Sequence, residues 1–352
     1  MKIGIATWQG VLNHGAVLQA IASKRVLEKM GHTVTYVDFQ AQSAGYVPPV
    51  KPRSTMLLWN KIGRRLFTKK KIRIFQQFRQ QHITLLPAKC NTWDAVMIGS
   101  DEVFSIEGGF NKELFGIDYR CPVFSYAASC GPSTKEQFAA SEYRDQIANG
   151  LRTMKGIGVR DQNTYDVVHS LAGITPVMNI DPVLLYAFKD EIVQMGEKPR
   201  RHIGLYAYTF RWDTDSEIEM VKQYAKMQNE NVDSLGFHHG WCSRNIVVDP
   251  IQMLEQFKSH RLIITDTFHG TIMAVITHTP FCVMVRNNSP KLLHLLHILG
   301  LEGRQITQAH TIEQIASETI DFNDIEKRLE IYRKQSMDYL FAMLDCCGGI
   351  KA

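Results

Sequence analysis

Short apolar runs alternate with longer segments of helical periodicity along most of the chain. In the first half the runs have strand length, and the segments 16–30 and 135–148 between them repeat apolar residues every three or four positions. Strands that alternate with helices are typical of βαβ units around a parallel sheet. The predicted strands are 2–8, 33–39, 93–98, 122–126, 156–159 and 176–180.

A second series follows the stretch 198–201, Lys-Pro-Arg-Arg, which is typical of a domain linker. The amphipathic segment 311–344 predicts helices that close the second domain or pack back on the first. The sequence therefore predicts an α/β protein with two Rossmann-like domains facing a cleft, 1–198 and 199–352. The strands of this series are 202–208, 232–237, 262–264 and 281–285, and its helices are 216–227, 253–258 and 271–277.

One strand-to-helix junction of the second series carries a histidine, His269. The apolar run 262–264 ends just before Asp266 and Thr267, whose side chains can cap a helix start, and Gly270 keeps the turn open. Ligands of open α/β sheets bind at this edge, and the free N–H groups of a helix start suit an anion. His269 is therefore a candidate ligand contact. A histidine that only hydrogen-bonds locally is the alternative, and position alone favours neither.

Polar or small residues also follow the predicted strands of the first series. The turn 9–15 lacks the GxGxxG fingerprint of dinucleotide binding, and a plain turn is the alternative to a ligand contact there. Arg160 can hold a phosphate or carboxylate through two parallel hydrogen bonds, with a salt bridge to Asp161 as the alternative. The residues at these strand ends are Asn13, His14, Gly15, Ser100, Asp101, Ser129 and Arg160.

Composition bears on the location and the cofactors. The chain opens on an apolar segment too short for a signal peptide, and it contains no apolar run of about 18 residues that would span a membrane. Its seven cysteines include no CxxC pair, which favours reduced thiols over a zinc site. We therefore expect a cytoplasmic protein without a metal.

Basic residues are concentrated in one segment. No Asp or Glu occurs between Asp38 and Asp94, an interval with eleven Lys and Arg, although the net charge of the chain is only +5. The stretch 56–81 combines these cations with apolar residues at helical spacing, which predicts a basic helical insertion at about 51–82 in the first domain. A solvated helix face is the usual role of such a run, but the absence of acidic residues favours an anionic partner. We do not expect that partner to be a nucleic acid.

Eight short motifs, taken together, resemble those of the polysaccharide pyruvyl transferase family. They occur in the order of that family and cover roughly residues 1–310. The resemblance implies a fold like that of two-domain GT-B glycosyltransferases. The motifs are NHGAVLQA, FRQQHI, IGSDEVF, SYAASCG, GVRD, DPVLL, YAYT and TDTFHGT.

The resemblance also implies an activity. Pyruvate would pass from phosphoenolpyruvate to two hydroxyls of a sugar in a cell-surface polysaccharide precursor, forming a cyclic ketal and releasing phosphate. Phosphoenolpyruvate is then a co-substrate, no further cofactor is expected, and the acceptor is a sugar or a lipid-linked oligosaccharide. Because a lipid-linked acceptor sits at the membrane, the resemblance implies peripheral contact of the basic segment 51–79 with the inner face of the cell membrane. A basic rim that only attracts phosphoenolpyruvate into the cleft is the alternative. His269 is the expected proton donor to the methylene carbon, and Asp101 is the other candidate for proton transfer. The donor is expected to contact Arg160, Thr267, Phe268 and Gly270, and the acceptor side comprises Asn13, His14, Gly15, Ser100 and Ser129.

Two positions depart from the family pattern. Thr267 stands where many relatives have an arginine that helps to bind phosphoenolpyruvate, so another cation must assist Arg160. On the expected acceptor side, GSDEVFS replaces the common GSDQVWN. The candidates for the assisting cation are Arg211, Arg244 and Arg286.

Two other functions are compatible with the same fold. A nucleotide-sugar glycosyltransferase would bind a nucleoside diphosphate in the second domain, but no acidic pair for its ribose is evident there. A non-catalytic partner in a polysaccharide assembly complex would account for Thr267. The intact sequence around His269, with Thr271 and Pro280 in place, disfavours such decay.

Overall fold

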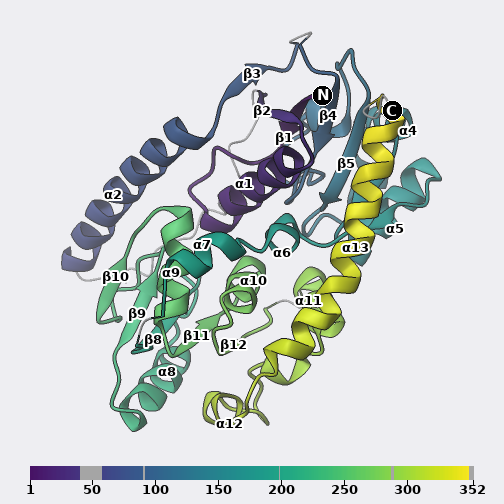
Figure 1. Ribbon diagram of the computed structural model, residues 1–352. Helices are drawn as coiled ribbons and strands as arrows, with labels where there is room; N and C mark the ends of the chain where they lie inside the picture. Colours follow the sequence, from purple (N-terminus) through teal and green to yellow (C-terminus); the bar gives the residue numbers. More distant parts are fainter. Residues whose placement is uncertain (40–57, 90–91, 198, 287–288, 349–352) are drawn as a thin grey trace.

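Two α/β domains, each built on a parallel sheet, make up the protein (Figure 1). The first sheet has the strand order β3-β2-β1-β4-β5-β6-β7, the second has β10-β9-β8-β11-β12, and their neighbouring strands are parallel. This is the Rossmann-like architecture that the alternating pattern predicts. The start of the basic segment (51–57) and Lys198 of the predicted linker lie outside the described residues. The computed structural model describes residues 1–39, 58–89, 92–197, 199–286 and 289–348.

The strands are short, and helices cover both faces of the sheets. Every residue of β4, β5, β8 and β11 is buried, as expected for strands in the middle of parallel sheets. The first sheet comprises β1 (Lys2–Ala6), β2 (Thr33–Asp38), β3 (Leu85–Pro87), β4 (Ala95–Ile98), β5 (Val123–Ala128), β6 (Ile157–Val159) and β7 (Val177–Met178). The second comprises β8 (Ile203–Tyr206), β9 (Val232–Leu235), β10 (Arg244–Ile246), β11 (Leu262–Thr265) and β12 (Phe281–Val283).

Most of the helices connect successive strands. None of the described helices combines the length and the apolar character that crossing a bilayer requires. Those before β8 are α1 (His14–Lys29), α2 (Leu58–His82), α3 (Lys135–Ala140), α4 (Arg144–Thr153), α5 (Gln162–Ala172), α6 (Pro182–Tyr186) and α7 (Lys189–Gln194). Those after it are α8 (Asp215–Met227), α9 (Pro250–Ser259), α10 (Phe268–Ile276), α11 (Pro290–Leu299), α12 (Ile312–Ser317) and α13 (Phe322–Cys346).

Two segments predicted as continuous helices are each divided. The segment 135–148 forms α3 and α4, because the backbone becomes extended at Ser141, where ψ is 137°. The segment 311–344 forms α12 and α13. Glu318 is extended, and the Asp321 side chain accepts hydrogen bonds from backbone N–H groups in the first turn of α13. In both places a residue with a strong capping preference lies at or near the break.

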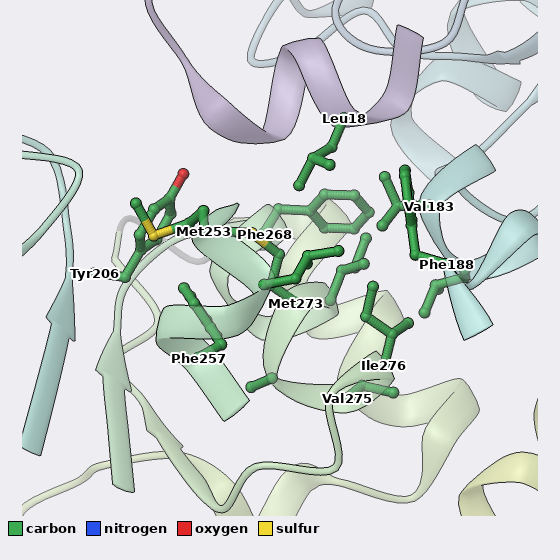
Figure 2. Close-up of a cluster of buried hydrophobic side chains, with 14 of the residues drawn as sticks. Leu18, Val183, Phe188, Tyr206, Met253, Phe257, Phe268, Met273, Val275 and Ile276 are labelled. Carbon is green, nitrogen blue, oxygen red and sulfur yellow. The ribbon is translucent and has the colours of Figure 1, made fainter. Parts of the chain in front are cut away.

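A continuous hydrophobic cluster joins the two domains (Figure 2). Leu18 of α1 belongs to the first domain, and Phe268 and Met273 of α10 belong to the second. Val183 of α6 and the adjacent Phe188 complete the cluster on the first-domain side. Full burial of one such side chain contributes about 1.5–3 kcal/mol, so this contact is a substantial part of the fold.

The C-terminal helix α13 runs from the second domain back to the first (Figure 1). Tyr339 and Leu340 of α13 lie in one buried cluster with Ile3 and Tyr126 of the first sheet. The Tyr339 hydroxyl donates a hydrogen bond to the carbonyl oxygen of Ser125 at 2.8 Å. The last helix is therefore an integral part of the core of the first domain.

The basic insertion forms one long helix, α2, and one of its lysines is buried. Lys71 is 6% exposed, and its Nζ donates to the carbonyl oxygen of Gly236 in the second domain at 2.7 Å. The same Nζ lies 4.3 Å from the ring centre of Phe237. Burial lowers the pKa of Lys71 to about 7. Lys71 therefore attaches α2 to the second domain and is lost from the basic surface.

We expect the lowered pKa of Lys71 to make the free energy of unfolding depend on pH. An unfolded lysine keeps its proton up to about pH 10.4, whereas folded Lys71 releases it near neutrality, so the unfolded chain binds the extra proton between these limits. Raising the pH from 7 to 9 should therefore increase the free energy of unfolding by about 2 kcal/mol more in the wild type than in Lys71→Met. Urea unfolding at both pH values measures this difference. Lys70→Met, which alters an exposed neighbour, should behave as the wild type, and an identical pH response in Lys71→Met would contradict the assignment.

Candidate functional site

The strand order of each sheet reverses at one place, between β1 and β4 in the first and between β8 and β11 in the second. In open α/β sheets the loops beyond the carboxyl ends of such strands diverge and form the ligand site. Asp101 follows β4, and His269 lies just after β11. Two of the residues predicted from the sequence therefore lie at the switch points of the two sheets.

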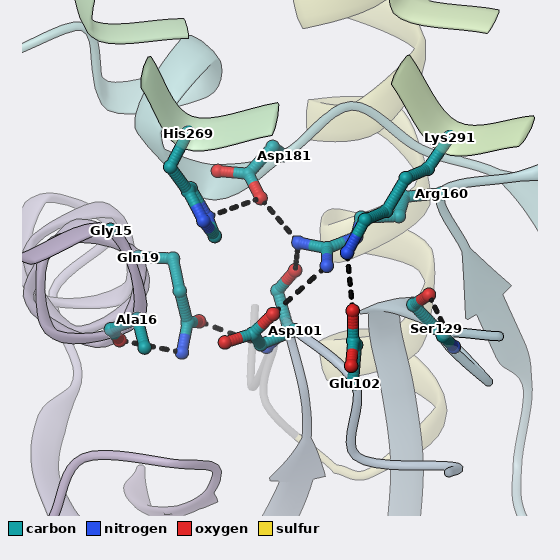
Figure 3. Close-up of polar contacts among 12 residues, drawn as sticks. Gly15, Ala16, Gln19, Asp101, Glu102, Ser129, Arg160, Asp181, His269 and Lys291 are labelled. Atoms are coloured by element: carbon teal, nitrogen blue, oxygen red, sulfur yellow. Dashed lines mark hydrogen bonds and ion pairs between the residues drawn. The ribbon is translucent and has the colours of Figure 1, made fainter. Parts of the chain in front are cut away.

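Four helices begin around His269 (Figure 3). His269 is the second residue of α10, and a Cβ on Gly15, the second residue of α1, would lie 2.2 Å from its ring. Asp181 caps α6 beside the same imidazole, and Lys291 is the second residue of α11. None of these helices has an acidic residue in its first turn. Because the Asp181 carboxylate already caps α6, the positive ends of α1, α10 and α11 are the ones that favour an anion here.

The His269 imidazole is nearly buried, with 9% of the residue exposed. Its Nε2 lies 3.5 Å from Oδ2 of Asp181, which is an ion-pair distance, and it forms no hydrogen bond. Because a buried polar nitrogen without a hydrogen bond is costly, this atom is suited to a hydrogen bond or a proton transfer with a ligand. Gly15 is required at its position, since any larger residue would displace the ring.

Arg160 directly follows β6 and binds two carboxylates (Figure 3). One belongs to Asp101 at the first switch point, and the other belongs to Asp181, which lies beside His269 at the second. Its Nη1 donates to Asp181 at 2.7 Å and to the Ser100 hydroxyl at 3.3 Å, and its Nη2 donates to Asp101 at 3.0 Å. Asp161 does not pair with it in these contacts and instead caps α5. The guanidinium is thus held by two carboxylates, and only its Nε lacks a partner.

The carboxylates of this network stay ionised. Burial alone raises the pKa of Asp181, but contact with His269 and the charge of Arg160 outweigh burial, and the pKa is lowered. The pKa of Asp101 is also lowered, because Arg160, His269 and Lys291 together outweigh its burial. Asp101 has φ 73°, in the left-handed region that is rare for residues other than glycine and is often found at functional sites.

Phe268 lies between two cations. Its ring centre is 4.7 Å from the Arg160 guanidinium carbon and 5.8 Å from Nζ of Lys291. Lys291 forms an ion pair with Glu102 across the domain interface. Burial lowers the pKa of Lys291, but the Glu102 carboxylate outweighs this, so the pKa is raised and the lysine is a cation. Phe268 therefore belongs to the site as a platform for positive charge.

Thr267 and Gly270 form the start of α10. The Thr267 hydroxyl accepts the backbone N–H of Gly270 at 2.9 Å and lies 3.0 Å from the hydroxyl of Thr265. A Cβ on Gly270 would lie 2.2 Å from that Thr265 hydroxyl, so glycine is required there. In this structure Thr267 is a helix cap that fixes the position of His269.

The predicted residues at the first strand-to-helix turn face different ways. Asn13 caps α1 through the N–H of Gly15 at 2.9 Å, and its Nδ2 donates to the Tyr208 hydroxyl of the second domain at 3.1 Å. His14 points away from His269. It is fully buried, and its Nε2 lies 3.1 Å from the Val248 carbonyl oxygen. Burial lowers the pKa of His14 well below its ordinary value, so it packs as a neutral side chain.

The two predicted serines are also fully buried. The Ser100 hydroxyl accepts a hydrogen bond from Arg160 and donates one to the Ala127 carbonyl oxygen at 2.8 Å. Ser129 accepts the N–H of Gly131 at 3.0 Å and thus closes a turn after β5. Ser100 therefore belongs to the network around Arg160, whereas Ser129 supports the neighbouring loop.

The three arginines considered as assisting cations are all paired with carboxylates. Arg244 donates to Asp233 through Nε at 3.0 Å and also through Nη2. Arg286 donates to Asp266 at 2.6 Å, and its Nη1 lies 2.7 Å from a carboxylate of α8. Arg211 lies 3.6 Å from the same Asp266. Lys291, which the sequence did not suggest, is the second cation beside the Phe268 ring, after Arg160.

Asp181, Lys291 and Glu102 are the residues of this cluster that sequence reasoning missed. Asp181 and Lys291 carried a usable signal, since Asp181–Pro182 and Ser289–Pro290–Lys291 are typical helix starts with proline at the first position. Within the described residues, no three His, Cys, Asp or Glu side chains gather as metal ligands would.

Comparison with solved structures places the fold among known ones. The chain superposes on the S. aureus MnaA–UDP structure with a TM-score of 0.53 and 10% identity, over 100% of this chain and 98% of that one. It superposes on UDP-N-acetylglucosamine 2-epimerase from Rickettsia bellii with a TM-score of 0.50 and 9% identity, over 98% and 96% of the two chains. At these identities the likeness concerns the fold alone, and that fold is GT-B.

Comparison with curated protein sequences found no match. A family model, described as polysaccharide pyruvyl transferase, matches residues 13–288. The match begins at the Asn13 cap of α1 and extends beyond His269, so it includes Asp101, His269 and the elements that carry the Arg160 network. The chain is a member of the polysaccharide pyruvyl transferase family.

Proposed function

We propose that this protein transfers the pyruvyl group of phosphoenolpyruvate to two hydroxyls of one sugar in a cell-surface polysaccharide precursor. The product is a cyclic pyruvate ketal, and inorganic phosphate leaves. The observation that carries the proposal is the convergence of the N-termini of α1, α10 and α11 around His269, whose Nε2 forms no hydrogen bond. Helix starts bind phosphate and carboxylate groups, and phosphoenolpyruvate has both.

His269 is proposed as the proton donor. Its imidazolium protonates the methylene carbon of phosphoenolpyruvate while a sugar hydroxyl attacks the adjacent carbon, and the methylene becomes the methyl group of the ketal. Expulsion of phosphate and attack by the second hydroxyl close the ring. The ionised Asp181 at 3.5 Å stabilises positive charge on the imidazole, which supports its role as an acid.

Arg160 and Asp101 have different roles in this proposal. Because two carboxylates already occupy Nη1 and Nη2 of Arg160, we assign it chiefly to positioning Asp181 beside His269. Asp101 is the carboxylate nearest the first-domain switch point, and it is the candidate acceptor for a hydroxyl proton. Its lowered pKa makes it a weak base, so its larger contribution is to hold Arg160.

Lys291 is proposed as the cation that binds the donor in place of the family's arginine at position 267. It lies in the first turn of α11 and beside Phe268. Its ammonium group can leave the ion pair with Glu102 and bind a phosphate oxygen of the donor instead. Hydrogen bonds to charged groups contribute about 1.5–3 kcal/mol, so Lys291→Gln should raise the KM for phosphoenolpyruvate by about 10- to 150-fold.

Steady-state kinetics with varied phosphoenolpyruvate measure the effect of Lys291→Gln. Lys112→Gln removes a lysine from a comparable ion pair with Asp118 at the surface and should leave the donor KM unchanged. If the donor KM of Lys291→Gln equals that of the wild type, Lys291 does not contact the donor.

The acceptor is proposed to be a sugar, free or attached to a lipid carrier, that reaches His269 from the first domain. Among the predicted acceptor-side residues, Ser100 accepts a hydrogen bond from Arg160, and Asn13 caps the helix start at Gly15, which lies against His269. We propose that the reaction takes place in the cytoplasm.

Incubation with phosphoenolpyruvate and a panel of free and lipid-linked glycans tests the activity. We expect phosphate release together with an acceptor whose mass increases by one pyruvate less one water. Phosphate release without any gain in acceptor mass would contradict the ketal transfer. A gain of one hexose from a nucleotide sugar in a parallel incubation would favour the glycosyltransferase.

A further inference from the structure

Helix α2 has two faces, and one of them packs on the second domain. Lys71 binds the Gly236 carbonyl oxygen, and the ring of Phe67 lies 5.8 Å from that of His238. Arg64 stacks over Phe210 at 4.9 Å. This contact fixes the helix along the flank of the molecule, where Figure 1 shows it reaching from β3 to the level of β10.

The opposite face of α2, which we call the outer face, is exposed. Its centre holds two aliphatic side chains, Ile62 with 41% and Leu66 with 63% exposed. Helical spacing places cations on both sides of this pair, and these cations are exposed. The outer face comprises Lys61, Ile62, Arg65, Leu66, Lys69, Lys70 and Arg73.

The composition of α2 is unusual for a solvated helix. It contains no acidic residue along 25 positions, whereas α13, a helix of the same length, pairs its exposed Arg328 with Asp324. The outer face therefore carries five positive charges that no acidic residue of its own helix compensates. Ile62 and Leu66 lie beside these charges, and exposure of their apolar surface to water is unfavourable.

We propose that the outer face of α2 docks the protein on an anionic membrane surface. Cations near such a surface each improve affinity about fivefold, and Ile62 and Leu66 can enter the boundary between headgroups and acyl chains. A basic face with aliphatic residues at its centre matches an interfacial helix. This inference rests on the helix alone and holds whether or not the proposed pyruvyl transfer is correct.

The aliphatic pair favours lipid over nucleic acid as the occupant. Phosphate groups of a nucleic acid would neutralise the cations but would leave Leu66, which is 63% exposed, in water. Lys71 and Arg64 contribute nothing to the surface, because both are engaged with the second domain. Docking therefore depends on fewer cations than the basic segment contains.

Vesicle co-sedimentation of the full chain tests the proposal. We expect the wild type to bind vesicles with about 30% phosphatidylglycerol in phosphatidylcholine at low salt, to dissociate at 0.5 M salt, and to ignore pure phosphatidylcholine. The variant Lys69→Gln/Lys70→Gln/Arg73→Gln should bind about 100-fold more weakly, because three charges are removed. Leu66→Ser should weaken binding several-fold.

Matched controls exist on α13. The variant Lys327→Gln/Arg328→Gln/Lys334→Gln removes the same charge from exposed positions of an equally long helix and should bind as the wild type. Ile331, 61% exposed, matches Leu66, so Ile331→Ser should have no effect. Circular dichroism confirms that each variant is folded.

Three results would overturn the proposal. Wild type that ignores the anionic vesicles at low salt would show that the surface has another partner. Equal losses of vesicle affinity in the α2 and α13 triple variants would show that binding depends on the net charge of the protein and not on the outer face. Capture by duplex DNA at salt concentrations that abolish vesicle binding would identify a nucleic acid as the occupant.

Discussion

Replacing His269 by alanine should lower pyruvyl transfer by about 10²–10⁴-fold, the usual contribution of a general acid. The fold should survive, because Nε2 of this side chain makes no hydrogen bond and most of the surrounding core belongs to other residues. The measurement is phosphate release from phosphoenolpyruvate in the presence of the acceptor, with thermal unfolding as the check on folding.

A second buried histidine provides the control. His260 also lies beside a buried carboxylate, with Nε2 3.3 Å from Asp233, but it follows α9 at the opposite end of the second sheet. His260→Ala should reduce stability and leave the turnover number of the folded protein unchanged. If His269→Ala retains more than about a tenth of the activity, a loss far below that of a general acid, His269 is not the proton donor.

Removing the side chain of Arg160 should have the largest effect on stability. Arg160→Ala leaves the carboxylates of Asp101 and Asp181 without their cation, and their side chains are 15% and 0% exposed. Breaking a buried ion pair by removing one partner costs about 3–5 kcal/mol. Denaturant unfolding at pH 7 should therefore show a loss of this size in the free energy of unfolding.

The cause of that loss can be separated from a simple loss of packing. Arg160→Met/Asp101→Asn/Asp181→Asn removes the charges on both sides and should recover part of the stability. Arg328→Ala breaks an exposed pair with Asp324 and should change stability by less than about 0.5 kcal/mol. A loss below about 1 kcal/mol in Arg160→Ala would mean that the carboxylates find other partners or protonate at little cost.

The fold was predictable because its signals are local. Parallel strands that are buried on both faces are continuous apolar runs, such as Leu262–Thr265, and they stand out between helical segments. The edge strands β3 and β10 were missed, since three residues with a proline or an arginine among them carry no such signal. The break between α12 and α13 was missed because the amphipathic pattern continues through the cap at Asp321.

The candidate site was predictable only in part. His269 was found because it lies in a recognisable strand-to-helix junction, and Arg160 because it ends a strand. Asp181 and Lys291 were not found, because they are distant from His269 in the sequence and only folding brings them to the site. His14 was predicted on the acceptor side because it stands between Asn13 and Gly15. Successive helical residues point about 100° apart, so the His14 side chain packs in the core while Gly15 faces His269.

Titration calorimetry of the purified protein with phosphoenolpyruvate, repeated in the presence of UDP, tests the central claim most directly. The proposed pyruvyl transfer predicts saturable binding of phosphoenolpyruvate that UDP does not displace. Binding of UDP, with no heat from phosphoenolpyruvate, would contradict the pyruvyl transfer proposed for this member of the family.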